Sequence, residues 1–287
     1  PAAFKYGYLA TLHESLQQAK HAISATSQIG TPIPERTANH PTAITHIVEP
    51  QSYKKALASP QAPLWQIAMT DEMESFRELC VFGSGPLPQF TIAIPVKWVF
   101  KLKTGEEDQP LRYKARVVVC GFMKRDGIDV DETYAPVSKY ASLRYLVSHC
   151  CAEKIDITHL DIKTAFLNAP LEEIVWCAPP LGVTVPLGNK LRLNKALYGL
   201  KQAPRAWIVV LAKTLLTVGF VPSTAGPCLY VLITPSGERI FLNTYVDDLF
   251  LAANPSQAKD SIIAGLSKAF AITNLGIMKT PLGIEIT

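Results

Sequence analysis

The stretch "IFLNTYVDDLFLAA", residues 240–253, places two adjacent carboxylates, Asp247 and Asp248, inside an otherwise apolar run. The apolar, β-branched and aromatic residues on both sides predict two strands, with a turn at the aspartates. A turn explains one aspartate well, because aspartate is favoured in turns and solvent accepts its charge. It explains the second less well, since neighbouring carboxylates repel each other unless a cation lies between them. A magnesium ion, which prefers hard oxygen ligands, would remove this conflict.

A cation site of this kind needs a further carboxylate, and Asp161 in "THLDIKTAFLNAPLEE" (residues 158–173) is the natural candidate. It lies in a strand-like run between Leu160 and Ile162. An aspartate at a strand end or at a helix N-cap is the simpler explanation, and for Asp161 alone it is the favoured one. Both explanations stay open on this pattern.

The segments around these aspartates predict a mixture of helices and strands. Residues 64–79 place Trp65, Met69 and Phe76 on one helical face, with acidic residues opposite. Two β-rich runs, residues 91–103 and 112–122, flank a polar loop with a glycine and predict a hairpin. Further elements are expected as a helix over 140–154, a strand that turns helical over 156–167, helices from near Pro204 to Gly219 and over 256–270, and a closing strand over 279–287. This order favours an α+β fold on a small antiparallel sheet over a doubly wound fold.

The composition is that of a chain that mostly folds. Hydrophobic residues make up 48% of the 287 positions and charged residues 18%, and this length allows one domain with an appendage or two domains. Residues 1–62 differ, since proline and threonine interrupt the periodic pattern outside a short helix expected over residues 9–25. We interpret them as a Pro/Thr-rich tail or linker that is partly disordered. No apolar run is long enough to cross a bilayer, so we expect a soluble, intracellular protein with no membrane partner.

Basic residues gather in two segments. Eight Lys or Arg residues against three acids lie between Lys97 and Arg125, and five against none lie between Lys190 and Arg205. Two such segments suit the neutralisation of a phosphate backbone. A solvated surface explains them equally well.

Residues 245–248 read "YVDD", which resembles the Y-x-D-D signature of reverse transcriptases. Six further blocks resemble copia-type retrotransposon polymerases and follow the order of that family: "KWVFKLK", "YKARVVVCGF", "GIDVDETYAPV", "LDIKTAFLNAPLEE", "KALYGLKQAPRAW" and "LGIEI". Seven ordered blocks are far more specific than a single Y-x-D-D. The match runs from about Trp65 to Thr287.

The resemblance implies the palm and fingers of such a polymerase, with an antiparallel sheet and helices in the palm and a hairpin in the fingers. On this match residues 63–287 form the polymerase, with the fingers mainly 63–150 and the palm mainly 151–287. The thumb, connection and RNase H regions are expected to be absent, because the chain stops after "LGIEIT". Weak holding of the template is then expected.

In these polymerases three aspartates hold two Mg²⁺ ions, for which Mn²⁺ is a substitute, and the matching positions are Asp161, Asp247 and Asp248. One ion activates the primer 3′-hydroxyl, and the other steadies the triphosphate and the leaving pyrophosphate. The implied reaction transfers a nucleotide from a dNTP to the primer end. Such catalysis is mainly positioning and charge stabilisation, so no His or Cys nucleophile is required.

The resemblance also implies further site residues. The family carries an aromatic residue at Phe166 under the sugar of the incoming nucleotide, where its ring would clash with a 2′-hydroxyl; a buried core phenylalanine is the alternative. At Gly199 the missing side chain lets the backbone approach the nucleotide. The implied nucleotide-binding residues are Lys103, Lys114, Arg116, Ile162, Phe166, Tyr198, Gly199 and Lys201. The implied primer- or template-binding residues are Tyr245, Val246, Gln202, Arg205, Leu282 and Gly283. Which basic residue of the hairpin contacts the triphosphate stays open.

The implied partners are an RNA or DNA template with its primer and dNTPs, within a Gag-Pol polyprotein that also carries integrase and RNase H. The implied location is the cytoplasm, in a virus-like particle, with the nucleus as the alternative; the oligomeric state stays open. Departures from the family pattern, such as Ala169 in place of glycine and Gly226 in place of aspartate, keep a second hypothesis open. It is a degenerate, non-catalytic remnant that binds nucleic acid without extending a primer. A purely structural domain is a third hypothesis, against which the three carboxylates argue.

Overall fold

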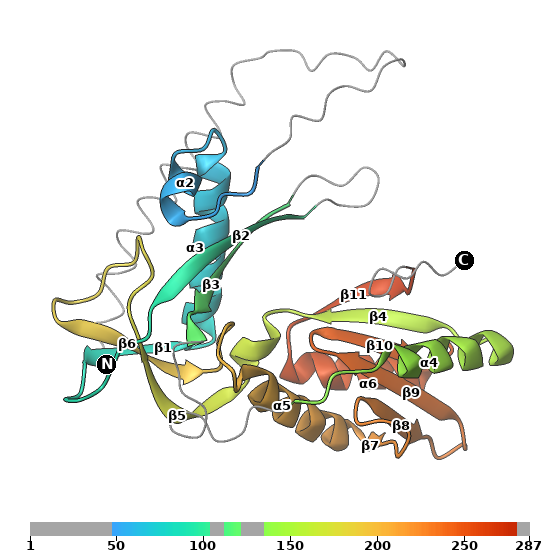
Figure 1. Ribbon diagram of the computed structural model, residues 1–287. Coiled ribbons are helices and arrows are strands. Elements are labelled where there is room, and N and C mark those ends of the chain that lie inside the picture. The colour runs from blue at the N-terminus through green and yellow to red at the C-terminus, as the bar shows by residue number, and fades with distance from the viewer. Residues whose placement is uncertain (1–47, 104–111, 122–134, 280–287) are drawn as a thin grey trace, which may run out of the picture. The chain divides into compact units, whose positions relative to one another are not determined.

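The computed structural model describes residues 48–103, 112–121 and 135–279. They form helices and antiparallel sheets (Figure 1), which confirms the predicted mixture of α and β elements. The chain divides into two compact units. The N-terminal unit comprises Pro1–Gly121 and Glu173–Leu193, and the C-terminal unit comprises Phe122–Glu172 and Asn194–Thr287.

The described part of the N-terminal unit contains two helices, a β-hairpin and most of a three-stranded sheet. Its elements are α2 (Tyr53–Leu57), α3 (Ala62–Glu78), β1 (Phe82–Pro86), β2 (Val96–Lys103), β3 (Arg112–Val119), and parts of β5 (Pro170–Cys177) and β6 (Asn189–Lys195). Strands β2 and β3 pair antiparallel, and the helix predicted over 64–79 and the hairpin are both confirmed.

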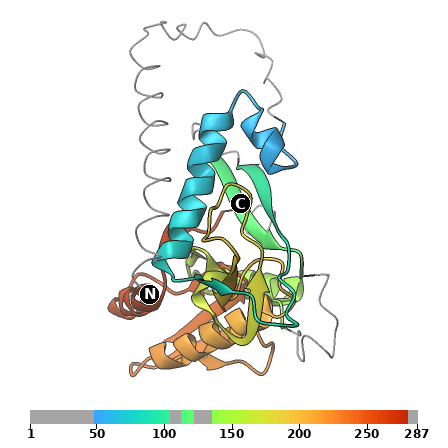
Figure 2. The same cartoon turned by 90° about the vertical axis from the view of Figure 1, so that its left-hand side faces the viewer.

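One face of the hairpin packs against α3, which lies along it in Figure 2. Trp65 of α3 is fully buried and makes edge-to-face contacts with Phe100 of β2 and Tyr113 of β3, at ring-centroid distances of 5.3 and 4.6 Å. Because side chains alternate along a strand, most of the apolar residues of both strands share this face. Burial of these aromatic rings stabilises the hairpin on the helix.

The opposite face of the hairpin is basic. Lys101 lies opposite Lys114 in the strand register, and Lys103 lies opposite Arg112. The same alternation places six basic residues on this face, which we call the basic face: Lys97, Lys101, Lys103, Arg112, Lys114 and Arg116.

The three-stranded sheet, in the order β1-β6-β5, was not predicted from the sequence pattern. Strand β1 reads "FGSGP", and its glycines and proline are typical of a turn. It is a strand because it pairs antiparallel with β6, with Phe82 opposite Leu193. Because β6 lies far from β1 in the sequence, the local pattern of residues 82–86 does not predict this pairing.

The C-terminal unit is built on a six-stranded antiparallel sheet in the order β11-β4-β10-β9-β8-β7. Its elements are α4 (Tyr140–Glu153), β4 (Ile157–Ile162), the 3₁₀ helix η2 (Ala165–Asn168), α5 (Ala203–Val218), β7 (Val221–Pro222), β8 (Leu229–Ile233), β9 (Arg239–Tyr245), β10 (Asp248–Ala252), α6 (Gln257–Ala269) and β11 (Ile272–Ile277). The helices and strands predicted within residues 140–270 are confirmed. Strand β4 lies between β10 and β11, so segments far apart in the chain become neighbours.

Both faces of this sheet are buried along β4 and β10. On one face Phe250 and Ile157 pack with Leu143 and Leu146 of α4. The other face carries Leu160, Leu249 and Leu251, which are fully buried. This double burial explains why "DLFLAA" is continuously apolar after its aspartate.

Helix α5 begins and ends where the sequence predicts. Pro204 lies in its first turn, where a missing N–H costs nothing. Gly219 caps its end with φ +107°, and the N–H of Phe220 returns to the carbonyl of Leu215. This left-handed cap is the usual reason for a glycine after a helix.

The observed units differ in extent from the division expected near residue 150. Helix α4 belongs to the C-terminal unit because it packs on the six-stranded sheet, and residues 173–193 belong to the N-terminal unit. The predicted tail, 1–62, contains α2 and the start of α3 at its end, and Ala56 of α2 is fully buried. The helix expected over 9–25 and most of the strand expected over 279–287 lie outside the described residues. Within the described ranges, no helix combines the length and apolar character needed to cross a membrane.

Candidate active site

The two adjacent aspartates lie at a tight turn between β9 and β10. Tyr245 ends β9 and pairs with Asp248, the first residue of β10, so Val246 and Asp247 form the loop. The predicted hairpin is confirmed, and it has the shortest common loop length. Asp247 and Asp248 are partly exposed at the end of the sheet.

Asp161 lies beside this turn. It is directly opposite Asp248 in the antiparallel register of β4 and β10, and side chains opposite each other share one face with Cβ atoms about 5 Å apart. The backbone N–H of Ile162 donates to the carbonyl of Asp247 at 2.9 Å. The structure therefore brings the three predicted aspartates to one end of the sheet, from segments more than 80 residues apart in the chain.

The donor set fits a hard divalent cation. Two carboxylates on adjacent strands and a third in the turn supply the oxygen ligands that Mg²⁺ prefers. In the part of the chain that the structure describes, no group of three or more His, Cys, Asp or Glu side chains already converges on one metal position. Mg²⁺ is commonly bound by only one or two carboxylates in proteins, and Asp161 and Asp248 face each other across β4 and β10.

His159 is a neighbour of the site that the sequence analysis did not single out. Its Nε2 lies 2.7 Å from Oδ1 of Asp248, and because an ionised carboxylate only accepts, the imidazole donates. The ring also packs against Phe250, with centroids 5.0 Å apart. The signal was present in the sequence, since a residue two positions before Asp161 on a strand lies on the same face.

Two β-branched residues of the described chain have left-handed backbones, and both flank the aspartates. Thr164 follows β4 with φ +51°, and Val246 precedes Asp247 with φ +56°. This conformation is unfavourable for β-branched residues and persists only where the surroundings impose it. Asn168 supports the first of these turns, because its Nδ2 donates to the carbonyl of Thr164 at 3.2 Å.

Two of the residues predicted to bind the nucleotide are in contact with each other. Phe166 of η2 and Tyr198 meet edge to face with ring centroids 5.0 Å apart. Gly199 has φ +89°, so a left-handed backbone is itself a reason for glycine there. The other predicted residues around the start of α5 are buried Gln202 and half-buried Lys201 and Arg205.

The predicted triphosphate contacts Lys103, Lys114 and Arg116 lie in the N-terminal unit, on the basic face. Partial burial, and then the positive charges of Arg116 and Lys103, hold the pKa of Lys114 below its ordinary value. A lysine crowded by cations gains from the approach of an anion. Lys101 is engaged by Glu49, whose carboxylate lies 2.9 Å from its Nζ.

The acidic residues of α3 were expected to lie opposite the apolar side of the helix, and for Glu72 this expectation is wrong. It is 7% exposed, and its Oε1 accepts a 3.4 Å hydrogen bond from the N–H of Val117. Residue 72 is seven positions after Trp65 and four before Phe76, which is helical spacing for the same face. Burial raises the pKa of Glu72 to about 7, although the Val117 N–H and then the charges of Arg116 and Lys114 oppose the rise.

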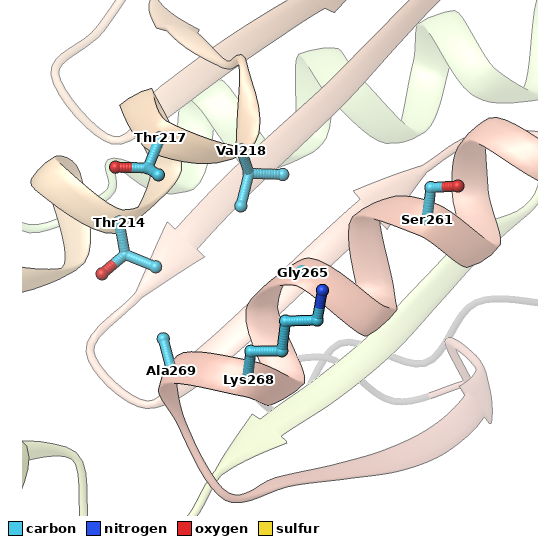
Figure 3. A pocket seen from close by; sticks show the side chains of 7 residues that line it. All are labelled: Thr214, Thr217, Val218, Ser261, Gly265, Lys268 and Ala269. Carbon is cyan, nitrogen blue, oxygen red and sulfur yellow. The ribbon is translucent and has the colours of Figure 1, made fainter.

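Two of the predicted primer contacts, Leu282 and Gly283, lie outside the described residues. A groove of about 420 Å³ lies between α5 and α6 (Figure 3). Its lining residues are Thr214, Thr217, Val218, Ser261, Gly265, Lys268 and Ala269. None of the predicted site residues lines this groove, so it is separate from the aspartate site.

Comparisons with known proteins identify the family of this chain. A family model described as reverse transcriptase (RNA-dependent DNA polymerase) matches residues 81–287. The Retrovirus-related Pol polyprotein from transposon TNT 1-94 of Nicotiana tabacum is 36% identical over 241 residues, covering 83% of this chain and 18% of that protein. The corresponding polyprotein from transposon RE2 of Arabidopsis thaliana is 31% identical over 268 residues, covering 92% of this chain and 18% of that protein.

The chain thus spans less than a fifth of the length of these two relatives. A solved structure of a foamy viral protease-reverse transcriptase in complex with ds DNA has a TM-score of 0.39 and 11% identity, covering 77% of this chain and 33% of that chain. That likeness is too low to support an argument about the fold. The family match covers most of the chain, including all three aspartates. The chain therefore belongs to the copia-type branch of the reverse transcriptase (RNA-dependent DNA polymerase) family.

Proposed function

We propose that this chain carries the RNA-directed DNA polymerase activity of a copia-type retrotransposon, adding nucleotides from dNTPs to a primer 3′-hydroxyl. The observation that carries the proposal is the register of β4 and β10, which sets Asp161 opposite Asp248 and beside the turn with Asp247. Family membership supports it, because the matched segment includes these three residues.

Mg²⁺, when bound, supplies activation of the 3′-hydroxyl and neutralises charge on the triphosphate and pyrophosphate. We assign Asp161, Asp247 and Asp248 as the carboxylates that hold two such ions, with the carbonyl of Ile162 as a further ligand. Two-residue hairpin geometry and the Ile162–Asp247 hydrogen bond orient these groups before substrate arrives. Preorganisation of this kind is the main contribution a protein makes to phosphoryl transfer.

We assign the C-terminal unit as the palm and the basic face of the N-terminal unit as part of the fingers. Lys103, Lys114 and Arg116 then bind the triphosphate, with Arg116 suited to a bidentate contact. We assign further contacts by motif. Tyr198, Gly199 and Lys201 contact the nucleotide, and Tyr245, Val246, Gln202, Arg205, Leu282 and Gly283 contact the primer or template.

Phe166 is proposed to exclude ribonucleotides. Its half-buried ring is held edge to face by Tyr198. Replacing Phe166 with alanine is expected to raise rNTP incorporation relative to dNTP incorporation by about tenfold to a hundredfold, because a pocket rejects one extra hydroxyl by about that factor. The measurement is the ratio of single-nucleotide incorporation rates for the two substrates. Phe166→Tyr keeps the ring and should keep the discrimination; an unchanged ratio in Phe166→Ala would contradict this role.

The proposed partners are an RNA or DNA template with its primer and dNTPs. The proposed context is a Pol polyprotein with integrase and RNase H, acting in a cytoplasmic virus-like particle. The 18% share of the relatives that this chain covers is consistent with such a context.

The experiment is primer extension on an RNA template annealed to a DNA primer, with dNTPs and Mg²⁺ or Mn²⁺. The protein is in excess over the template, so that weak binding and low processivity do not hide a single addition. We expect extension that EDTA abolishes. No extension with either metal, at protein concentrations that saturate template binding, would contradict the proposal.

The alternative is a non-catalytic remnant that binds nucleic acid, favoured by the basic face. It predicts salt-dependent template binding, measured by fluorescence anisotropy, without any extension. If the chain both binds the template and extends the primer, the remnant hypothesis is excluded. If the chain does neither, both hypotheses are excluded.

A further inference from the structure

A tryptophan from α5 holds the turn that carries two of the aspartates. Nε1 of Trp207 donates a hydrogen bond to the carbonyl of Val246 at 2.7 Å. Trp207 is 1% exposed, and its ring packs edge to face against Phe270 with centroids 5.1 Å apart. The indole is therefore fixed in a packed core, and its one donor is committed to the turn.

The accepting carbonyl belongs to the strained residue of that turn. Val246 has φ +56°, which is unfavourable for a β-branched side chain. The next carbonyl, of Asp247, accepts from the N–H of Ile162 at 2.9 Å. Two consecutive carbonyls are thus held by donors from two different elements, α5 and β4. A strained residue persists where contacts with the surrounding structure fix the backbone conformation. Here the two hydrogen bonds to the turn do so.

The orientation of the aspartates depends on this backbone. Val246 is one residue from Asp247 and two from Asp248, and the peptide planes between them set the direction in which each carboxylate leaves the turn. A rotation of the Val246–Asp247 peptide would move both side chains relative to Asp161 on β4. The hydrogen bond from Trp207 opposes that rotation.

We propose that Trp207 is a positioning residue for the active site, acting through the carbonyl of Val246 on the carboxylates of Asp247 and Asp248. The role rests on the proposed polymerase function and adds to it a residue that touches neither substrate nor metal. Groups that orient metal ligands in this way commonly change metal affinity or activity by about 10-fold to 100-fold when they are removed.

The test replaces Trp207 with phenylalanine, which keeps a packed aromatic ring and removes the N–H. We expect kcat for nucleotide addition to fall about 10-fold to 100-fold with little change in the KM for dNTP. We also expect Mn²⁺ to bind about tenfold more weakly, measured by electron paramagnetic resonance on the protein without substrate. A purely structural role would lower the folded fraction and leave both the kcat per folded molecule and the Mn²⁺ affinity of the folded protein unchanged.

Trp176 provides a matched control. It is also buried, and its indole N–H has no hydrogen-bond partner among the residues that the structure describes. Trp176→Phe therefore loses the same atoms without losing a hydrogen bond, and should keep the activity and Mn²⁺ affinity of the unmutated chain. Hydrogen exchange of the amides of residues 245–248, measured without metal, should be faster in Trp207→Phe than in the control.

Equal exchange, equal Mn²⁺ affinity and equal kcat in Trp207→Phe and Trp176→Phe would overturn the proposal. The exchange measurement decides it even if the unmutated chain extends no primer, so failure of the polymerase function remains distinguishable. If Trp207→Phe does not fold, substitution of Trp207 by 3-benzothienylalanine keeps the ring shape and replaces the N–H with sulfur. The same exchange difference is expected for that variant, and its absence would overturn the proposal.

Discussion

Replacing Asp248 with asparagine is expected to reduce primer extension about a thousandfold, which corresponds to about 4 kcal/mol of lost transition-state stabilisation. Asparagine is nearly isosteric and keeps an oxygen toward His159, but it removes the negative charge that opposes Asp161 across the strands. The measurement is single-turnover extension on an RNA template, with template binding measured separately by fluorescence anisotropy. Binding should remain, because the basic face is untouched.

Asp156 offers a matched control for this substitution. It is an exposed aspartate immediately before β4, at the end of the sheet away from the turn. Asp156→Asn should leave both extension and template binding unchanged. If Asp248→Asn extended primers as fast as Asp156→Asn, Asp248 would have no part in the reaction.

Replacing Glu72 with glutamine is expected to stabilise the protein at pH 8 by up to about 3 kcal/mol and to have little effect below pH 4.5. Burial raises the pKa of Glu72 from 4.5 to about 7. A carboxyl whose pKa is higher when folded binds more protons in the folded state, so its stabilising contribution is lost as the pH rises from about 4.5 through about 7. Glutamine keeps an acceptor for the N–H of Val117 and never ionises.

The measurement is urea denaturation at a series of pH values between 4.5 and 8, comparing free energies of unfolding. Glu74→Gln is the matched control, because Glu74 lies on the exposed side of the same helix and pairs with Arg77 at the surface. A surface ion pair of this kind contributes little to the free energy of unfolding. The effect of Glu74→Gln should therefore show no comparable dependence on pH. An advantage of Glu72→Gln that was the same at pH 5 and pH 8 would contradict a titrating buried carboxyl.

The turn with Asp247 and Asp248 was predictable from the sequence because the pattern that predicts it is local, whereas the place of Asp161 followed from the family resemblance. The apolar flanks of Asp247 and Asp248 predicted strands joined by a turn, and the register then placed Asp161 opposite Asp248. The helices α3 and α5 were predictable for the same reason, since periodicity and end signals such as Gly219 lie within the segment itself.

The features that were missed depend on contacts between distant segments. Strand β1 exists only because β6 pairs with it, and "FGSGP" alone predicts a turn. The hydrogen bond from Trp207 to Val246 joins residues 39 positions apart, and no rule of residue spacing predicts it. Glu72 was misplaced for a different reason: its helical spacing put it on the buried face, but its charge favoured assignment to the exposed one.

The proposed function is templated nucleotide transfer by the aspartates at the β4–β10 junction. Its most direct test is single-nucleotide incorporation opposite a defined base of an RNA template, with each of the four dNTPs in turn, by the unmutated chain and by Asp161→Asn. The expected result is Mg²⁺-dependent addition of the complementary dNTP by the unmutated chain and at most a trace by Asp161→Asn. Equal incorporation by the two proteins, or none by the unmutated chain on a saturating template, would contradict the claim.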